Sequence, residues 1–228
     1  MIKFNVYIGY DEREHIAAEV CRYSIWSRTN DYVPVTFLKS SNIHEYMRPK
    51  EPNQSTDFTY TRFMIPFLEK YQGVSVFCDC DFLFQADIEE LISAVDLSYP
   101  VSVVKHPEYI PHSGIKMDGI PQHTMRRKNW ASLMVFNNAH PFNKKLSPEF
   151  VNTITPGRVL HTFDWLNDNE IGSLPPDWNA LAGYQYFDNP KAIHYTDGGP
   201  WFIDYTDTMY AERWEEEHDY FANSCGAP

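Results

Sequence analysis

Two aspartates at the end of an apolar run are the residues of this sequence best suited to chemistry. Asp79 and Asp81 follow the run Val74-Ser75-Val76-Phe77-Cys78 directly. On an extended backbone, residues two apart project to the same face, so the two carboxylates point together while Cys78 and Cys80 point to the other face. Carboxylates are hard oxygen ligands that suit Mg²⁺ or Mn²⁺. The pair therefore predicts a divalent-cation site with open positions for water or for the oxygens of a diphosphate.

The position of the two aspartates favours a metal site over a chance occurrence of the D-x-D sequence. A D-x-D sequence is common, and most examples lie solvated in loops. Two unpaired acids that close a buried strand would repel each other and lose solvation, which favours a partner cation. The alternative of a zinc site at Cys78 and Cys80 is weaker, because the chain has no second cysteine pair and both side chains point towards the core.

Strands and helices must alternate to position this pair. Apolar runs and turn residues predict strands near residues 1–8, 33–38, 74–78, 101–104, 131–136 and 191–195. Helical spacing predicts helices at 11–26, 60–71 with a kink at Pro66, and 87–95. The alternation favours an α/β fold with a mostly parallel sheet, whose ligand site lies beyond the carboxyl ends of the strands. The long segment 105–129 is typical of a functional loop.

Length and charge set further bounds. The 228 residues favour a single domain, and 19 Lys and Arg against 31 Asp and Glu give a net charge of −12. This charge repels polyanions, so we expect no nucleic-acid partner. Four irregularly spaced cysteines are unlike a secreted disulfide scaffold and favour a reducing, cytoplasmic compartment. No apolar run approaches the length of a transmembrane segment, and no leader sequence is evident.

About thirty residues around the aspartates resemble the retaining glycosyltransferases of family 8, which include glycogenin and bacterial lipooligosaccharide galactosyltransferases. The similar part comprises Tyr60-Thr61-Arg62-Phe63, the strand 74–78 with Asp79 and Asp81, and Asp87-Ile88-x-x-Leu91. The resemblance implies a GT-A fold, which is a Rossmann-like, mostly parallel mixed sheet flanked by helices. It also implies that Asp79 and Asp81 hold Mn²⁺, or Mg²⁺, against the diphosphate of a nucleotide sugar.

A second motif near the C-terminus supplies the third metal ligand by resemblance. The segment from Ile193 to Trp201 is similar to the family motif His-x-x-Gly-x-x-Lys-Pro-Trp, which makes His194 the expected ligand. The motif is one residue shorter here, and Gly199 or Pro200 replaces the lysine that contacts the diphosphate. Arg62 is the first candidate for the missing cation. Lys105 and the basic run 126–128 are the others, although such a run is most often a solvated loop.

The resemblance also places residues at the nucleotide and at the reacting sugar. Tyr10 would stack on uracil, and Asp11 would accept a hydrogen bond from the base or the ribose, or would only cap the following helix. Asp164 would bind donor hydroxyls near the anomeric carbon as the catalytic residue, or would lie on a helix surface. Trp165, Trp178 and Trp201 are candidates for sugar stacking or for core packing. The expected nucleotide-binding set is Gly9, Tyr10, Asp11, Arg62, Cys80, Gly198 and Gly199.

These features together favour a metal-dependent retaining glycosyltransferase that moves a hexose from UDP-glucose or UDP-galactose to an acceptor hydroxyl. The acceptor would be a glycan or a lipid-linked glycan. Within the single domain, residues 1–100 would bind the nucleotide, 101–210 would bind the acceptor and carry catalysis, and an acidic tail would follow. Two alternatives stay open: a nucleotide-sugar binding module without turnover, and a metal-dependent phosphoesterase.

Overall fold

A central sheet of six strands forms the middle of the molecule. The computed structural model describes residues 2–51, 54–108, 115–116, 120–121 and 126–225. The strands of the central sheet are β1 (Phe4–Gly9), β2 (Val35–Leu38), β3 (Val74–Cys78), β5 (Val101–Val103), β8 (Leu133–Asn137) and β9 (Ile171–Ser173). Their order is β2-β1-β3-β8-β5-β9. Every residue of β3 is buried, as its continuous apolar run predicts.

Strand β8 runs against its two neighbours, whereas the other three pairings of the sheet are parallel. The expected mostly parallel sheet is therefore confirmed. Cys78 at the end of β3 pairs with Leu133 at the start of β8. Because β8 is reversed, the residues before Leu133 lie at the same sheet edge as the residues that follow Cys78. This edge carries the candidate site.

A smaller sheet continues from that edge. It has the order β10-β11-β4, with β10 (Ala180–Leu181), β11 (Ala192–His194) and β4 (Phe82–Phe84). His194 pairs with Phe82 in the antiparallel ladder between β11 and β4. A separate two-stranded ladder joins β6 (Ile115–Lys116) to β7 (Ile120–Pro121).

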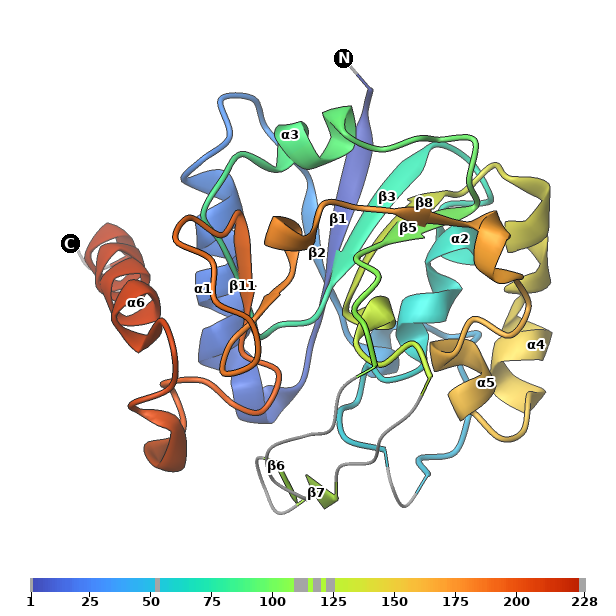
Figure 1. Ribbon diagram of the computed structural model, residues 1–228. Helices are drawn as coiled ribbons and strands as arrows, with labels where there is room; N and C mark the ends of the chain where they lie inside the picture. Colours follow the sequence, from blue (N-terminus) through green and yellow to red (C-terminus); the bar gives the residue numbers. More distant parts are fainter. Residues whose placement is uncertain (1, 52–53, 109–114, 117–119, 122–125, 226–228) are drawn as a thin grey trace.

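Helices cover both sides of the sheets (Figure 1). The α-helices are α1 (His15–Trp26), α2 (Ile65–Leu68), α3 (Ile88–Ser93), α4 (Pro148–Thr153), α5 (Arg158–His161) and α6 (Ala211–Cys225). Short 3₁₀ helices are η1 (Glu12–Glu14), η2 (Ser40–Asn42), η3 (Thr61–Met64), η5 (Trp130–Ser132), η6 (Pro141–Lys145), η7 (Asp168–Glu170), η8 (Pro176–Trp178) and η9 (Ile203–Tyr205). Helix α6 lies beside α1, where Arg28 donates to Glu217 across 2.8 Å.

The expected helix over 60–71 is shorter and mixed. It consists of η3 and α2, with Pro66 in the first turn of α2. Lys70 and Tyr71 then have left-handed φ angles of 54° and 56°, which end the helix. The helix expected to start near Asp11 does so, because the Asp11 side chain accepts from the Arg13 amide and caps η1. Among the described residues, no helix has the length and apolar character that crossing a membrane requires.

Candidate metal centre

The structure brings Asp79, Asp81 and His194 together at the sheet edge. Each residue offers one ligand atom, and these three atoms lie within 4.8 Å of one another. His194 Nε2 is 3.4 Å from Asp81 Oδ2, and the His194 side chain is 2% exposed. Two carboxylate oxygens and one imidazole nitrogen form a donor set that suits Mn²⁺, which accepts both ligand types. The residues present therefore fit the expected metal, and three residues far apart in sequence form one cluster.

Backbone pairing holds the three side chains in place. The Asp79 amide donates to the Ser132 carbonyl at 2.9 Å, and the Tyr195 amide donates to the Asp81 carbonyl at 3.0 Å. The Phe82 ring stacks on the His194 imidazole with their centroids 4.5 Å apart. The first aspartate is thus tied to the start of β8, and the second to the end of β11.

Arg62 is bonded to the first aspartate. Its Nη1 lies 2.6 Å from Asp79 Oδ1 and donates to the Ala131 carbonyl at 2.7 Å. The Arg62 side chain is 5% exposed and packs near the rings of Phe58 and Phe77. The sequence interpretation assumed two aspartates without a protein partner, but Asp79 is bonded to Arg62, and Asp81 Oδ2 lies 3.4 Å from His194 Nε2. A contact of Arg62 with a nucleotide stays a prediction.

A buried asparagine that the sequence did not single out is hydrogen-bonded to His194, the third candidate ligand. Asn179 Oδ1 lies 3.0 Å from His194 Nδ1, and Asn179 Nδ2 donates to Ser132 Oγ at 3.0 Å. Asn179 is fully buried. It follows η8 in an irregular segment without a sequence motif, and the pairing of Ala180 with Ile193 places it beside the histidine.

His106 is a second residue of this region that sequence reasoning missed. It is 5% exposed, and its Nε2 has no hydrogen-bond partner among the residues that the structure describes. Burial, and secondarily the neighbouring His194, lower the pKa of His106 to about 4, against the opposing effect of a hydrogen bond with Asn179. The imidazole is therefore neutral at neutral pH.

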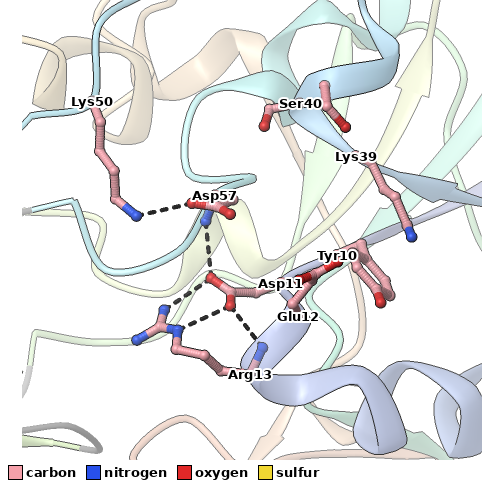
Figure 2. A pocket seen from close by; sticks show the side chains of 9 residues that line it. Tyr10, Asp11, Glu12, Arg13, Lys39, Ser40, Lys50 and Asp57 are labelled. Atoms are coloured by element: carbon pink, nitrogen blue, oxygen red, sulfur yellow. Dashed lines mark hydrogen bonds and ion pairs between the residues drawn. The ribbon is translucent and has the colours of Figure 1, made fainter.

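A cavity of about 360 Å³ lies where β1 and β2 end. Figure 2 shows Lys39, Ser40, Lys50 and Asp57 around Asp11 and Arg13. The cavity is lined by Tyr10, Asp11, Glu12, Arg13, Lys39, Ser40, Ser41, Lys50 and Asp57. It carries both signs of charge and lies at the carboxyl ends of two parallel strands, where α/β sheets bind ligands.

The side chains of Asp11 and Tyr10 both interact with other protein groups that line or adjoin this cavity. Asp11 accepts from the amides of Arg13 and Asp57 and from the Arg13 guanidinium. Burial alone would raise the pKa of Asp11, but these hydrogen bonds lower it below its ordinary value. Lys39 Nζ lies 3.9 Å from the centroid of the Tyr10 ring, whose hydroxyl pairs with His15 Nδ1 at 3.1 Å. The capping interpretation of Asp11 is confirmed, whereas its contact with a nucleotide and the stacking of Tyr10 stay predictions.

The remaining candidates for nucleotide binding are close-packed. A Cβ on Gly9 would lie 2.3 Å from the Phe58 ring, and one on Gly199 would lie 2.0 Å from the Trp201 ring. Gly198 has φ +140°, and a Cβ there would lie 2.9 Å from Tyr205. Because these glycines have no side chain, aromatic rings pack directly against the backbone at the three positions. Their contact with a nucleotide stays a prediction.

Cys80 is 1% exposed, and burial raises the pKa of its thiol. Only its main chain is therefore suited to meet a ligand. Cys78 is also buried, with its Sγ 3.9 Å from Cys21 Sγ, which supports the core interpretation of both cysteines.

Asp164 is exposed and follows α5 in a turn. Arg127 fixes this turn, because its guanidinium donates to the carbonyls of Thr162 and Phe163 and pairs with Asp168. At 4% exposure, Arg127 is a buried structural residue and not part of a solvated run. None of the interactions described for residues 2–51, 54–108 and 126–225 joins Asp164 to the metal cluster. Its catalytic role stays a prediction.

The three tryptophans proposed for sugar stacking pack against protein. Trp178 is 1% exposed. Trp201 packs against the rings of Tyr195 and Trp214, and Trp165 packs against Phe63. The core interpretation fits these rings better than a sugar platform.

Comparison with known proteins supports the fold and gives one clear relative. No protein-family model matches the chain. The chain is 43% identical over 227 residues to Protein CDI of Arabidopsis thaliana, covering 96% of this chain and 87% of that protein. A relative of this identity and coverage shares the fold along nearly the whole chain.

Solved glycosyltransferases have the same architecture. The WbbM bifunctional glycosyltransferase matches with a TM-score of 0.63 and 18% identity over 95% of this chain, which spans 50% of WbbM. Galactosyltransferase LgtC, solved with donor and acceptor sugar analogues, matches with a TM-score of 0.61 and 13% identity over 95% of both chains. GlyE of Streptococcus pneumoniae matches with a TM-score of 0.62 and 16% identity over 97% of this chain and 63% of GlyE. The chain therefore has the GT-A fold of these enzymes.

Proposed function

The chain belongs to the family of Protein CDI from Arabidopsis thaliana, and from its GT-A fold and its Asp-Asp-His cluster we propose that it is a metal-dependent retaining glycosyltransferase. It transfers a hexose from a nucleotide diphosphate sugar, UDP-glucose or UDP-galactose, to a hydroxyl of a glycan or lipid-linked glycan. The observation that carries the proposal is the convergence of Asp79, Asp81 and His194 within 4.8 Å at the carboxyl edge of the sheet.

The residues of the cluster support diphosphate binding on an acidic protein. A divalent ion held there supplies Lewis-acid chemistry that offsets the charge of the leaving diphosphate. Asp79, Asp81 and His194 would hold it, while Arg62 orients Asp79 through the 2.6 Å bond. The cavity at the ends of β1 and β2 would take the nucleoside, with Tyr10 and Asp11 on its wall. Main-chain groups of Cys80, Gly198 and Gly199 would line the remaining nucleotide path.

Asp164 would bind donor hydroxyls and stabilise positive charge at the anomeric carbon. The acceptor oxygen forms its bond to that carbon on the face from which the diphosphate departs. The bond from the anomeric carbon to the phosphate oxygen breaks, and the acceptor proton passes to the departing phosphate oxygen. This route retains configuration and needs no protein nucleophile, which suits a region whose one candidate acid is exposed.

Release of UDP from UDP-glucose and UDP-galactose tests the proposal. The wild-type protein should release UDP with Mn²⁺ and not with a chelator, and Asp79→Ala should abolish release. Asp31→Ala, at an exposed position in the segment that leads into β2, is the matched control and should keep wild-type activity. UDP release that persists without a divalent cation would contradict the proposal.

The absence of a lysine at positions 199 and 200 favours one second candidate, a nucleotide-sugar binding module. In that case, calorimetry should detect UDP binding with Mn²⁺ while no donor releases its sugar. A phosphoesterase would instead cleave nucleotides that carry no sugar. UDP binding, sugar release and cleavage of UDP itself, measured side by side, therefore separate the three functions.

A further inference from the structure

A chain of hydrogen bonds leads from a backbone carbonyl to His194. Ser132 Oγ donates to the Asn129 carbonyl at 2.7 Å. Asn179 Nδ2 lies 3.0 Å from the same Ser132 Oγ, and Asn179 Oδ1 lies 3.0 Å from His194 Nδ1. Ser132, Asn179 and His194 are all at most 3% exposed, so water does not compete for these bonds.

The direction of each hydrogen bond follows from its first member. A carbonyl only accepts, so the single hydroxyl proton of Ser132 is used on the Asn129 carbonyl. Ser132 Oγ must therefore accept from Asn179, which turns the NH₂ group of that amide towards the serine. The amide oxygen then faces His194 and accepts from Nδ1–H. The remaining ring nitrogen, Nε2, keeps its lone pair.

We infer that Asn179, oriented by Ser132 and the Asn129 carbonyl, is a positioning residue that fixes His194 in the tautomer able to bind a cation. This inference rests on the proposed metal site. His194 Nε2 lies 3.4 Å from Asp81 Oδ2, so a lone pair faces a carboxylate oxygen. Two acceptors in that relation need a cation between them. The tautomer thus favours metal binding over a direct hydrogen bond from His194 to Asp81.

The backbone conformation of Asn129 helps to place this network at the sheet edge that carries the candidate metal site. Asn129 has a left-handed conformation with φ 61° and ψ 9° directly before η5. Its carbonyl accepts from the Ser132 hydroxyl, and its side chain reaches Thr196 Oγ1 at 3.0 Å. Asn129 is therefore bonded to Ser132, which orients Asn179, and to Thr196, which follows His194 by two residues. Outer-shell partners of this kind change metal affinity by about 10- to 100-fold when they are removed.

Nuclear magnetic resonance of ¹⁵N-histidine-labelled, metal-free protein tests the tautomer without relying on activity. The His194 signals are identified by their loss in His194→Gln. At about pH 8, above the ordinary pKa of histidine, the wild-type ring should carry its proton on Nδ1. In Asn179→Leu, which keeps the side-chain volume and removes the acceptor, the proton should move to Nε2. Calorimetry should show Mn²⁺ affinity reduced by about 10- to 100-fold.

Two further variants make the test specific. Asn179→Asp keeps the acceptor and should keep the Nδ1–H tautomer and wild-type or tighter Mn²⁺ binding. Ser132→Ala leaves Asn179 in place but removes the group that orients its amide, so it should give a mixture of His194 tautomers. This variant replaces Asn179→Leu in the test if Asn179→Leu does not fold. Asn143→Leu makes the same exchange at a fully buried asparagine that binds the Pro100 carbonyl, and should change neither readout.

An Nε2–H tautomer in the wild-type protein would overturn the inference. So would a folded Asn179→Leu with unchanged His194 signals and unchanged Mn²⁺ affinity. A wild-type protein that shows the Nδ1–H tautomer and binds no Mn²⁺ would contradict the proposed function and leave the positioning of His194 by Asn179 intact.

Discussion

Arg62 Nη1 lies 2.6 Å from Asp79 Oδ1, so the first candidate metal ligand already has a positive partner within the protein. The Arg62 side chain is 5% exposed and the Asp79 side chain 18% exposed, which makes the pair mostly buried. A partner of this kind lowers the cost of holding the carboxylate at the sheet edge before any ion arrives. The arginine and a metal ion would then share one carboxyl group.

Removing the arginine should make stability depend on metal. Arg62→Met leaves Asp79 without its guanidinium and should lower the free energy of unfolding by about 3 kcal/mol, because removing one partner of a mostly buried pair leaves the other charge unpaired. Saturating Mn²⁺ should recover a larger part of that loss than it adds to the wild-type protein. Urea unfolding with and without Mn²⁺ measures both effects.

The control for this prediction breaks an exposed pair. Lys191→Met removes the 2.9 Å contact with Glu90, and its effect should stay within about 0.5 kcal/mol in either condition. Equal Mn²⁺ stabilisation of Arg62→Met and the wild-type protein would contradict the sharing of Asp79.

Asp164 should affect turnover and not the binding of Mn²⁺ or UDP. Asp164→Asn removes the charge proposed to stabilise the anomeric centre and should lower sugar transfer by about 100-fold, with Mn²⁺ and UDP affinities within about twofold of wild type. Initial rates of UDP release and calorimetry measure the two quantities. The exposed Asp188→Asn should change neither. Wild-type rates in Asp164→Asn would assign the residue to the surface instead.

His106 should make stability fall in mild acid. The folded-state pKa is about 4 and the ordinary value is 6.5, so the unfolded chain takes up the proton first as the pH falls. The contribution is complete above pH 6.5 and declines between 6.5 and about 4, by at most about 3 kcal/mol. His106→Gln should flatten this part of the curve, measured by urea unfolding across that range. His44→Gln, at an exposed position, should keep the wild-type slope.

Gly9 should tolerate no side chain while Phe58 is present. Gly9→Ala places a methyl group 2.3 Å from the Phe58 ring and should cost about 1–3 kcal/mol of unfolding free energy. Phe58→Leu makes room, so the double variant should lose less than the sum of the two single losses. Strict additivity would show that the methyl group meets some other obstacle.

Local patterns were enough to predict most strands of the central sheet. The apolar run 74–78 forms β3 with the predicted bounds, and Asp11 caps the turn that leads into α1. These features depend on neighbouring residues alone. The sequence also predicted that Asp79, Asp81 and His194 belong together, because their motifs resemble those of a known family. The structure brings these three side chains into one cluster.

The contacts that orient the cluster depend on pairings between distant segments, which no local pattern encodes. Asn179 lies in an irregular segment and approaches His194 only because β10 pairs with β11. Arg127 looks like part of a solvated basic run, and only its enclosure by the carbonyls of 162–166 shows that it is buried. A buried lone histidine, such as His106, gives no periodic signal. Pro107, the next residue, indicates only that the strand predicted at 101–104 has ended.

The reversal of β8 also brings its preceding residues to the end of β5, where the Trp130 indole N–H donates to the His106 carbonyl at 3.0 Å. Asn129, the residue before Trp130, donates through its side-chain amide to Thr196 Oγ1 at 3.0 Å. The ends of β5 and β8 are thus joined to each other and to the segment that follows His194. A substitution at His106, Asn129 or Trp130 should therefore alter the surroundings of His194 without removing a candidate metal ligand.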